Sequence, residues 1–135
     1  MRLPLLLGLL ALSVPAEAAQ PVAGRWITPE GDSVVTIGPC GAAQCGRITR
    51  FLKSPPTPNP TDRNNPDPAL RSRPVLGLAV LSGFADEGKD WRGRIYDPRS
   101  GKSYKSILSR QADGTLKVQG CIAFLCRTQV WRPAR

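Results

Sequence analysis

The chain has 135 residues; 19 are Lys or Arg, 10 are Asp or Glu and none is His, so its formal net charge is +9. The absence of His excludes Ser–His–Asp triads, His-ligated metal sites and imidazole acid–base catalysis. A chain of this length predicts one domain with a genuine core.

The first 18 residues have the three parts of a secretory signal peptide. Arg2 precedes an apolar run over residues 3–14, and Ala16-Glu17-Ala18 forms a small-residue cleavage site. The run is shorter than the roughly 20 apolar residues of a membrane-spanning helix. We therefore expect cleavage after Ala18 and one β-barrel domain over residues 19–135. The protein would be periplasmic or extracellular and not membrane-spanning, and it would have no nucleic-acid partner.

Four Cys in an exported chain predict two disulfides. The pairs Cys40–Cys45 and Cys121–Cys126 each enclose four residues, which suits a hairpin loop, and we favour this pairing. A pairing that links the two loops stays open. Zinc is disfavoured because the tighter C-x2-C spacing and His are both absent. We expect no metal and no cofactor.

Short β-rich runs alternate with turn signals from residue 24 to the end of the chain. Turns at residues 30–32, 97–101 and 112–114 join neighbouring strands as hairpins. This order predicts an all-β fold, a small antiparallel up-and-down barrel of about eight strands. The predicted strands are 24–28, 33–37, 46–52, 77–84, 91–97, 102–110, 115–120 and 127–132.

Residues 53–73 interrupt the strand pattern with six prolines. Proline at this density cannot belong to a central strand. Loops of this length are typically functional or disordered. The segment is therefore interpreted either as an ordered loop or lid over the barrel, or as a mobile linker.

Pairing Asp97 with Lys102, and Leu108 with Leu116, gives three strands a common apolar face. Trp91, Gly93, Ile95, Tyr104, Ser106, Leu108, Leu116 and Val118 then point inward. The outer face carries a basic stripe of Arg92, Arg94, Lys105 and Lys117. This stripe is either solvated surface or a docking site for an anionic envelope polymer or lipid headgroup.

A Cys121–Cys126 hairpin extends this scheme and turns Arg127, Gln129 and Trp131 inward. An inward guanidinium needs an acidic, carbonyl, aromatic or ligand partner, because burying it unpaired is costly. In a closed barrel the last strand lies beside the first, so Arg127 or Arg132 is expected to stack on Trp26. A plug at the barrel end is the simpler interpretation of that contact.

Several motifs together resemble the bacterial domain of unknown function 2147 family. The resemblance spans nearly the whole of residues 24–129 and implies an exported bacterial protein, with no activity assigned. Gly24-Arg25-Trp26 and the late Arg also resemble lipocalin-like barrels, which implies a lipocalin-like form of the predicted fold. The motifs are Gly24-Arg25-Trp26, Gly31-Asp32-Ser33-Val34-Val35, Cys40-Gly41, Cys45-Gly46-Arg47-Ile48, Asn65-Pro66-Asp67-Pro68-Ala69-Leu70-Arg71, Arg73-Pro74-Val75-Leu76-Gly77-Leu78, Ile95-Tyr96-Asp97-Pro98, Gly101-Lys102-Ser103-Tyr104, Gly114-Thr115-Leu116-Lys117-Val118, Gly120-Cys121 and Leu125-Cys126-Arg127-Thr128-Gln129.

Inward polar groups beside aromatic residues are the usual composition of a ligand pocket. We expect a small amphipathic or anionic ligand, contacted within the barrel by Trp26, Tyr104, Arg127 and Gln129. The expected contacts from the lid are Asp62, Asn65, Arg71 and Arg73. Arg71 and Arg73 either clamp an anion or, more simply, neutralise Asp62 and Asp67.

Three function classes follow from these features. A non-catalytic binding barrel is the leading hypothesis, and an envelope interaction module acting through the basic stripe is the alternative. A hydrolase ranks third, because it would need two of Asp62, Asp67 and Asp97 to converge in a cleft. Calcium binding at residues 62–67 is disfavoured because Pro66 stands where a ligand belongs. The oligomeric state is left open.

Overall fold

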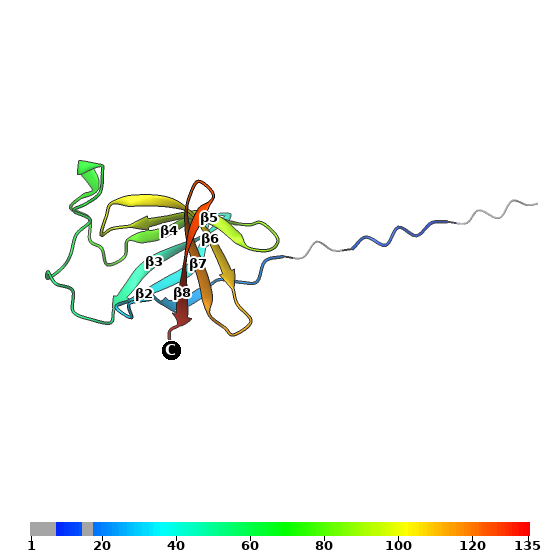
Figure 1. The fold of residues 1–135 in the computed structure, drawn as a ribbon, viewed down its shortest axis with the longest axis horizontal. Helices are drawn as coiled ribbons and strands as arrows, with labels where there is room; N and C mark the ends of the chain where they lie inside the picture. Colours follow the sequence, from blue (N-terminus) through cyan, green and yellow to red (C-terminus); the bar gives the residue numbers. More distant parts are fainter. Residues whose placement is uncertain (1–7, 15–17) are drawn as a thin grey trace, which may run out of the picture.

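The computed structural model describes residues 8–14 and 18–135, and eight strands form one closed antiparallel barrel (Figure 1). Each strand pairs with its neighbours in sequence, and β1 pairs with β8 to close the barrel. The predicted up-and-down barrel is thereby confirmed. The elements are β1 (Gly24–Ile27), β2 (Ser33–Cys40), β3 (Ala43–Phe51), a 3-10 helix η1 (Pro68–Leu70), β4 (Ala79–Asp86), β5 (Trp91–Asp97), β6 (Lys102–Arg110), β7 (Leu116–Ile122) and β8 (Leu125–Pro133).

The predicted signal peptide falls partly on residues 1–7 and 15–17, which lie outside the described residues. Residues 8–14 form no helix or strand and leave Leu9, Leu10 and Leu12 exposed, so this apolar stretch adds nothing to the barrel core. Cleavage after Ala18 stays a prediction. Among the residues described, no helix has the length and apolar character needed to cross a membrane.

Both favoured disulfides are present. Cys40 is bonded to Cys45 and Cys121 to Cys126, with Cα–Cα distances of 5.8 and 4.0 Å. The strands run further than predicted, however, because the cysteines lie inside the ladders rather than at the ends of four-residue loops. Only residues 41–42 and 123–124 form the turns, and Gly41 and Ala123 adopt positive φ there, as tight hairpin turns require.

The central register agrees with the predicted faces and differs in one pairing. Asp97 is opposite Lys102 as expected, but Leu108 pairs with Val118 rather than with Leu116. The turn between β6 and β7 closes with the Gln111 N–H donating to the Thr115 carbonyl, which shifts the register by two residues. Because side chains alternate with period two, the faces are unchanged.

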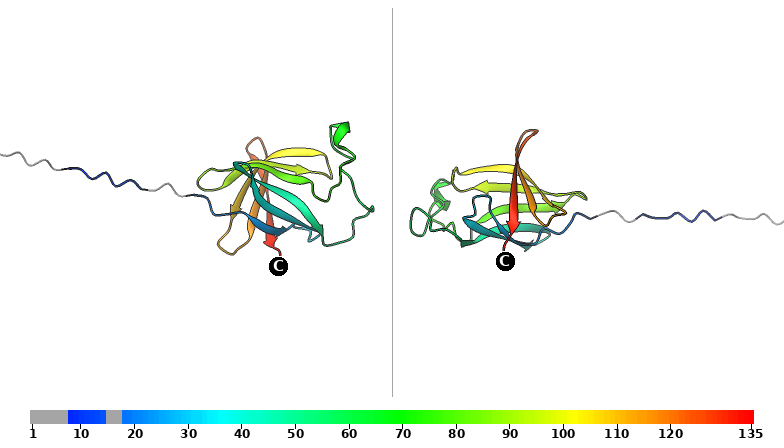
Figure 2. Two further views of the ribbon diagram at one scale, coloured as in Figure 1. Left: turned by 180° about the vertical axis from the view of Figure 1, so that it is seen from behind. Right: turned by 60° about the horizontal axis from the view of Figure 1, so that its bottom comes forward.

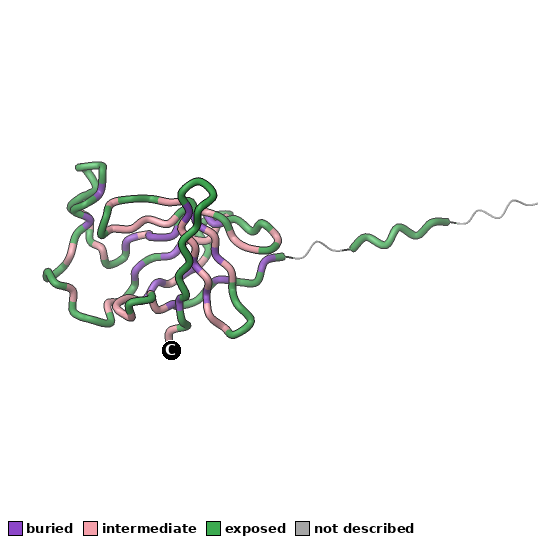
Figure 3. The backbone as a smooth tube through the Cα atoms, in the orientation of Figure 1, coloured by how far each residue is buried: buried purple, intermediate pink, exposed green. Residues whose placement is uncertain are grey.

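The strand directions give the barrel two distinct ends. The β1–β2, β3–β4, β5–β6 and β7–β8 connections lie at one end, which we call the mouth, and the other three connections lie at the closed end. The long β3–β4 connection, residues 52–78, extends at the mouth (Figures 1 and 2). Buried residues follow the strands, while the connections are mostly exposed (Figure 3).

Large side chains fill the closed end. Trp26 is 1% exposed, and its indole N–H donates to the Val22 carbonyl at 3.0 Å. The guanidinium of Arg110 lies 5.4 Å from the centre of the Trp26 ring. The expectation that Arg127 or Arg132 would stack on Trp26 is therefore wrong. Arg110, at the end of β6, lies at the closed end beside Trp26, whereas Arg127 lies near the mouth end of β8.

Gly93 allows the large side chains at the closed end, which we call the plug, to pack together. A Cβ atom at Gly93 would lie 2.5 Å from the Ser82 carbonyl oxygen and 2.8 Å from the Phe84 ring. Phe84 is 1% exposed, so its ring has no free space into which it could retreat. The absence of a side chain at Gly93 is what lets β4 and Phe84 pack against β5.

Gly93→Ala should therefore lower the free energy of unfolding by about 1–3 kcal/mol, because an added methyl group overpacks the core. Urea unfolding followed by tryptophan fluorescence measures the change. Gly38→Ala is the matched control, since a Cβ atom on that β2 glycine meets nothing within 4 Å. Equal unfolding midpoints for the two variants would contradict this account of the plug.

Candidate functional site

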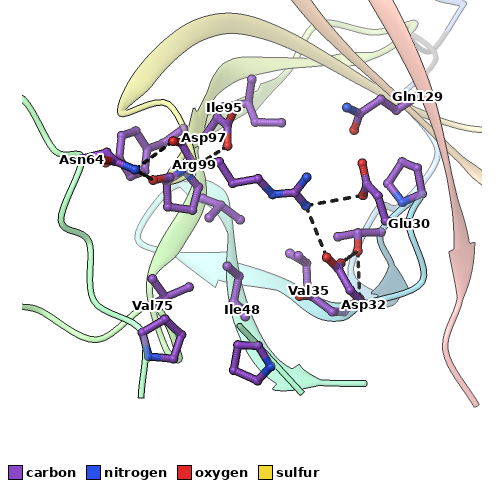
Figure 4. Close-up of a pocket in the computed structure, with 18 of the residues that line it drawn as sticks. Glu30, Asp32, Val35, Ile48, Asn64, Val75, Ile95, Asp97, Arg99 and Gln129 are labelled. Atoms are coloured by element: carbon purple, nitrogen blue, oxygen red, sulfur yellow. Dashed lines mark hydrogen bonds and ion pairs between the residues drawn. The ribbon is translucent and has the colours of Figure 1, made fainter. Parts of the chain in front are cut away.

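A cavity of about 1280 Å³, open to solvent on one side, lies at the mouth of the barrel between the strands and the long β3–β4 connection. That volume exceeds the typical small-molecule pocket of about 300–1,000 Å³. Its apolar wall comes from six of the eight strands and from the end of the connection that leads into β4. The apolar wall residues are Val35, Ile48, Phe51, Val75, Val80, Ile95, Val118 and Trp131, of which Figure 4 labels Val35, Ile48, Val75 and Ile95.

Charged groups ring the opening of the cavity. Arg99, in the β5–β6 turn, reaches across to the β1–β2 turn, where its Nη2 lies 3.3 Å from Asp32 Oδ2 and 3.6 Å from Glu30 Oε2 (Figure 4). The Thr28 hydroxyl also donates to Asp32 at 2.8 Å. Arg99 thus reaches two carboxylates across the mouth, and its charge compensates one of the two.

Three of the predicted ligand residues come together in the cavity wall. Tyr104 on β6, and Arg127 and Gln129 on β8, all line it. Arg127 stands opposite Gly120 in the β7–β8 ladder, so no side chain faces it from that strand. In the part of the chain that the structure describes, Arg127 forms no ion pair. Lys53 and Arg63 also line the cavity without an ion pair among the described residues, and Arg127 is the one of these three cations that a strand carries.

The other five predicted residues lie outside the cavity lining. Trp26 belongs to the plug at the closed end, and Arg71 uses its Nε to donate to the Asn65 carbonyl at 2.7 Å. Asp62, Asn65 and Arg73 bond one another within the loop. Their neighbours Arg63 and Asn64 line the cavity instead. The sequence contained no signal that separated these adjacent polar residues.

Asp62 holds the long loop on the barrel. Its side chain is fully buried and accepts hydrogen bonds from the Tyr96 hydroxyl, from Asn65 Nδ2 at 2.8 Å and from Arg73 Nε at 2.9 Å. Burial acts to raise the pKa of Asp62, but these hydrogen bonds outweigh it and the pKa lies below its ordinary value of 3.8. Burial and the bond to Asp62 raise the pKa of Tyr96 to about 12, so the Tyr96 hydroxyl remains a donor at neutral pH.

A second contact fixes the same loop to the β5–β6 turn. Asn64 Nδ2 donates to the Arg99 carbonyl at 2.8 Å, and the Asn64 backbone packs directly on Gly101. Gly101 has φ +71°, a left-handed conformation that glycine adopts without steric cost. These contacts tie the loop to the β5–β6 turn at one side of the mouth, and the interpretation of residues 53–73 as an ordered lid stays a prediction.

The predicted basic stripe is only partly assembled. Arg94 and Lys105 are exposed and directly opposite each other in the β5–β6 ladder. Arg92 is instead paired with Asp90 at 3.1 Å, and Lys117 is half-buried opposite Ser109. Two adjacent cations therefore stand where a row of four was expected.

Each carboxylate suggested for catalysis has a local partner. Asp67 accepts from the Ala69 N–H at the start of η1, and Asp97 accepts from the Arg99 N–H and the Ser100 hydroxyl in its turn. Both aspartates precede a proline and accept backbone hydrogen bonds within a turn, a common role of Asp. The Asp62 carboxylate already accepts hydrogen bonds from Tyr96, Asn65 and Arg73, a group that we call the clamp. Within residues 8–14 and 18–135, no cluster of three Cys, Asp or Glu side chains could hold a metal ion.

Comparisons with known proteins agree on the fold. Residues 24–132 match the model of a family described as an uncharacterized protein conserved in bacteria, DUF2147. The structure is similar to that of a protein from the human pathogen Helicobacter pylori that belongs to the lipocalin family. The TM-score is 0.76 at 21% identity, covering 85% of this chain and 84% of the other. No curated protein sequence matches significantly.

Tyr96→Phe should lower the free energy of unfolding by about 1–3 kcal/mol at neutral pH, because it removes a donor from a buried carboxylate. Tyr104→Phe is the control, since the Tyr104 hydroxyl makes no hydrogen bond with the described residues. Thermal unfolding of both variants compares them. Equal losses of stability in the two variants would show that the Tyr96–Asp62 hydrogen bond does not stabilise the fold.

The clamp also predicts a pH dependence. A carboxyl whose pKa is lowered on folding stabilises the protein above its unfolded value, here about 3.8, and this contribution disappears as the pH falls through the folded pKa. Asp62→Asn should therefore be less stable than the wild type at neutral pH, and the difference should shrink below that value. Denaturant titrations at several pH values measure it. A difference that stays constant down to about pH 2 would exclude this linkage.

Proposed function

The chain belongs to the DUF2147 family of bacterial proteins, and from that premise we propose that it is a non-catalytic carrier whose barrel binds a small amphipathic anion. The observation that carries this proposal is the unpaired Arg127 guanidinium at the top of an apolar cavity. An apolar wall accepts a hydrocarbon or ring system, and a cation at the opening orients its head group.

The preference for an anionic ligand rests on the groups that flank the cavity opening. Glu30 and Asp32 share one cation, Arg99, which leaves a single negative charge in the β1–β2 turn. Arg127 has no carboxylate partner in the described structure, and a guanidinium pairs bidentately with carboxylate or phosphate. An anionic head group placed at Arg127 therefore gains an interaction that a cationic one does not.

The proposed setting is the bacterial periplasm or the exterior. The two disulfides suit an oxidising compartment, and the predicted signal peptide would direct export. A carrier of poorly soluble anions would be useful in that aqueous space. The proposal contains no catalytic step, because the chain has no His and its candidate carboxylates serve the loop and turns.

Dodecanoate, dodecanol and dodecyltrimethylammonium share one tail and differ in head group, so calorimetric titration with the three tests the proposed ligand class. We expect binding strength to decrease in that order. Arg127→Gln should weaken dodecanoate binding about fivefold, because it removes one charged hydrogen bond whose strength is reduced by solvent exposure. Dodecanol binding should be unaffected. Arg25→Gln, an outward arginine at the closed end, is the control. Equal binding of all three probes would contradict the role of Arg127.

Gly120→Phe tests whether the ligand lies inside the barrel. A Cβ atom at Gly120 would meet only Ile95 and Tyr104, at 3.7 and 3.9 Å, so a larger side chain there can project into the cavity without disturbing the backbone. We expect the variant to fold, as circular dichroism can show, and to lose dodecanoate binding. A folded variant with unchanged affinity would place any bound probe outside the barrel.

A further inference from the structure

The β7–β8 hairpin carries an exposed apolar tip at the mouth end of the barrel. Ile122, Phe124 and Leu125 are 69%, 91% and 71% exposed. Elsewhere in residues 18–135, no large apolar side chain is more than 53% exposed. The hairpin projects beyond the rest of the barrel in the right-hand view of Figure 2. Phe124 at its tip contributes almost nothing to the core, so its apolar character is unexplained by folding.

This tip is a rigid projection. Ile122 pairs with Leu125 in the ladder, leaving only residues 123–124 in the turn. Directly below, the Cys121–Cys126 disulfide joins the two strands. The short turn holds Phe124 at the tip, while Ile122 and Leu125 line the opening of the cavity. Contiguous exposed apolar groups of this kind usually mark an interaction site.

The shape of the tip favours a lipid surface over a protein partner. A stable protein interface involves roughly 20–30 residues on each side, whereas the tip offers three apolar side chains on a narrow, convex hairpin. A bilayer needs no complementary pocket, because an aromatic or aliphatic side chain can enter the headgroup region individually. The size of the patch thus matches shallow insertion.

The charge around the tip selects the lipid. Lys105 is directly opposite Cys121 at the base of the hairpin, and Arg94 is opposite Lys105. Both cations are exposed, and neither forms an ion pair with the described residues. A basic pair beside an apolar tip complements anionic headgroups above a hydrocarbon layer.

We propose that this hairpin docks the protein on an anionic lipid bilayer. Phe124, with Ile122 and Leu125, inserts into the headgroup region while Arg94 and Lys105 contact the anionic headgroups. Because the β7–β8 turn lies at the mouth end, docking turns the cavity opening toward the lipid. The docking itself does not depend on whether the cavity holds a ligand.

Vesicle co-sedimentation tests the docking. The wild type should bind vesicles of mixed phosphatidylglycerol and phosphatidylcholine, bind phosphatidylcholine alone weakly, and dissociate at high salt. Phe124→Ser should lower the partition coefficient about tenfold, the effect of losing one buried aromatic side chain. Arg94→Gln combined with Lys105→Gln should weaken binding to the anionic vesicles only.

Matched controls separate the tip from general surface effects. Val130→Thr removes another exposed apolar side chain from β8, and Lys89→Gln removes a cation at the closed end; both should bind like the wild type. All variants are purified with one N-terminus, verified by mass, because residues 3–14 would themselves enter lipid if retained.

Three results would overturn the proposal. One is no binding to anionic vesicles, and another is unchanged binding by Phe124→Ser. The third is a wild-type dimer in sedimentation velocity that Phe124→Ser converts to monomer, which would make a second copy the occupant of the tip. If Phe124→Ser loses vesicle binding but still binds dodecanoate, the docking site and the cavity act independently.

Discussion

The interior of an eight-stranded barrel is the constraint on which this molecule depends. Such a barrel is just wide enough for side chains to fill it or for one small ligand to enter. This chain does both, in different halves. Trp26, Phe84, Leu108 and Leu116 occupy the closed end, and Gly93 admits the Phe84 ring by presenting no side chain of its own. Toward the mouth, Gly120 leaves space in which a Cβ atom would meet no close neighbour. The cavity exists because large residues are concentrated at one end.

The mouth depends on a second arrangement, the burial of Asp62 beneath the long loop. A fully buried carboxylate is costly unless its lone pairs are satisfied. Tyr96, Asn65 and Arg73 satisfy those of Asp62, and the Tyr96 bond ties the loop to β5. Prolines restrict the loop and so reduce the entropy lost when it is ordered. The loop residues that look most like a binding site in the sequence thus serve to position the rim, and Arg127 is the strand-borne cation available to a ligand.

The parts of this structure that were predictable are those set by local periodicity. Alternation assigned Leu108, Leu116 and Val118 to the core even though the register was two residues off, because a shift of two preserves the face. The short cysteine spacing likewise predicted both disulfides. Contacts between distant segments could not be read in this way. Tyr96 alternates outward with Arg94, and only the folding of a distant loop over β5 makes it the partner of Asp62. Nothing in the sequence distinguishes Arg99 from other turn residues. Only closure of the barrel places Glu30 and Asp32 opposite it.

The two disulfides are alike in sequence and differ in setting. Each closes a loop of only a few residues, so the entropy it removes from the unfolded chain is worth about 2 kcal/mol, less than for long loops. Cys40–Cys45 lies at the closed end, where the plug already holds the strands. Cys121–Cys126 lies at the mouth, below a turn whose side chains are exposed and pack against no core. A hairpin without such packing would be expected to fray. At this site the disulfide supplies the order that buried side chains supply elsewhere, and the apolar tip keeps a fixed direction beside the cavity.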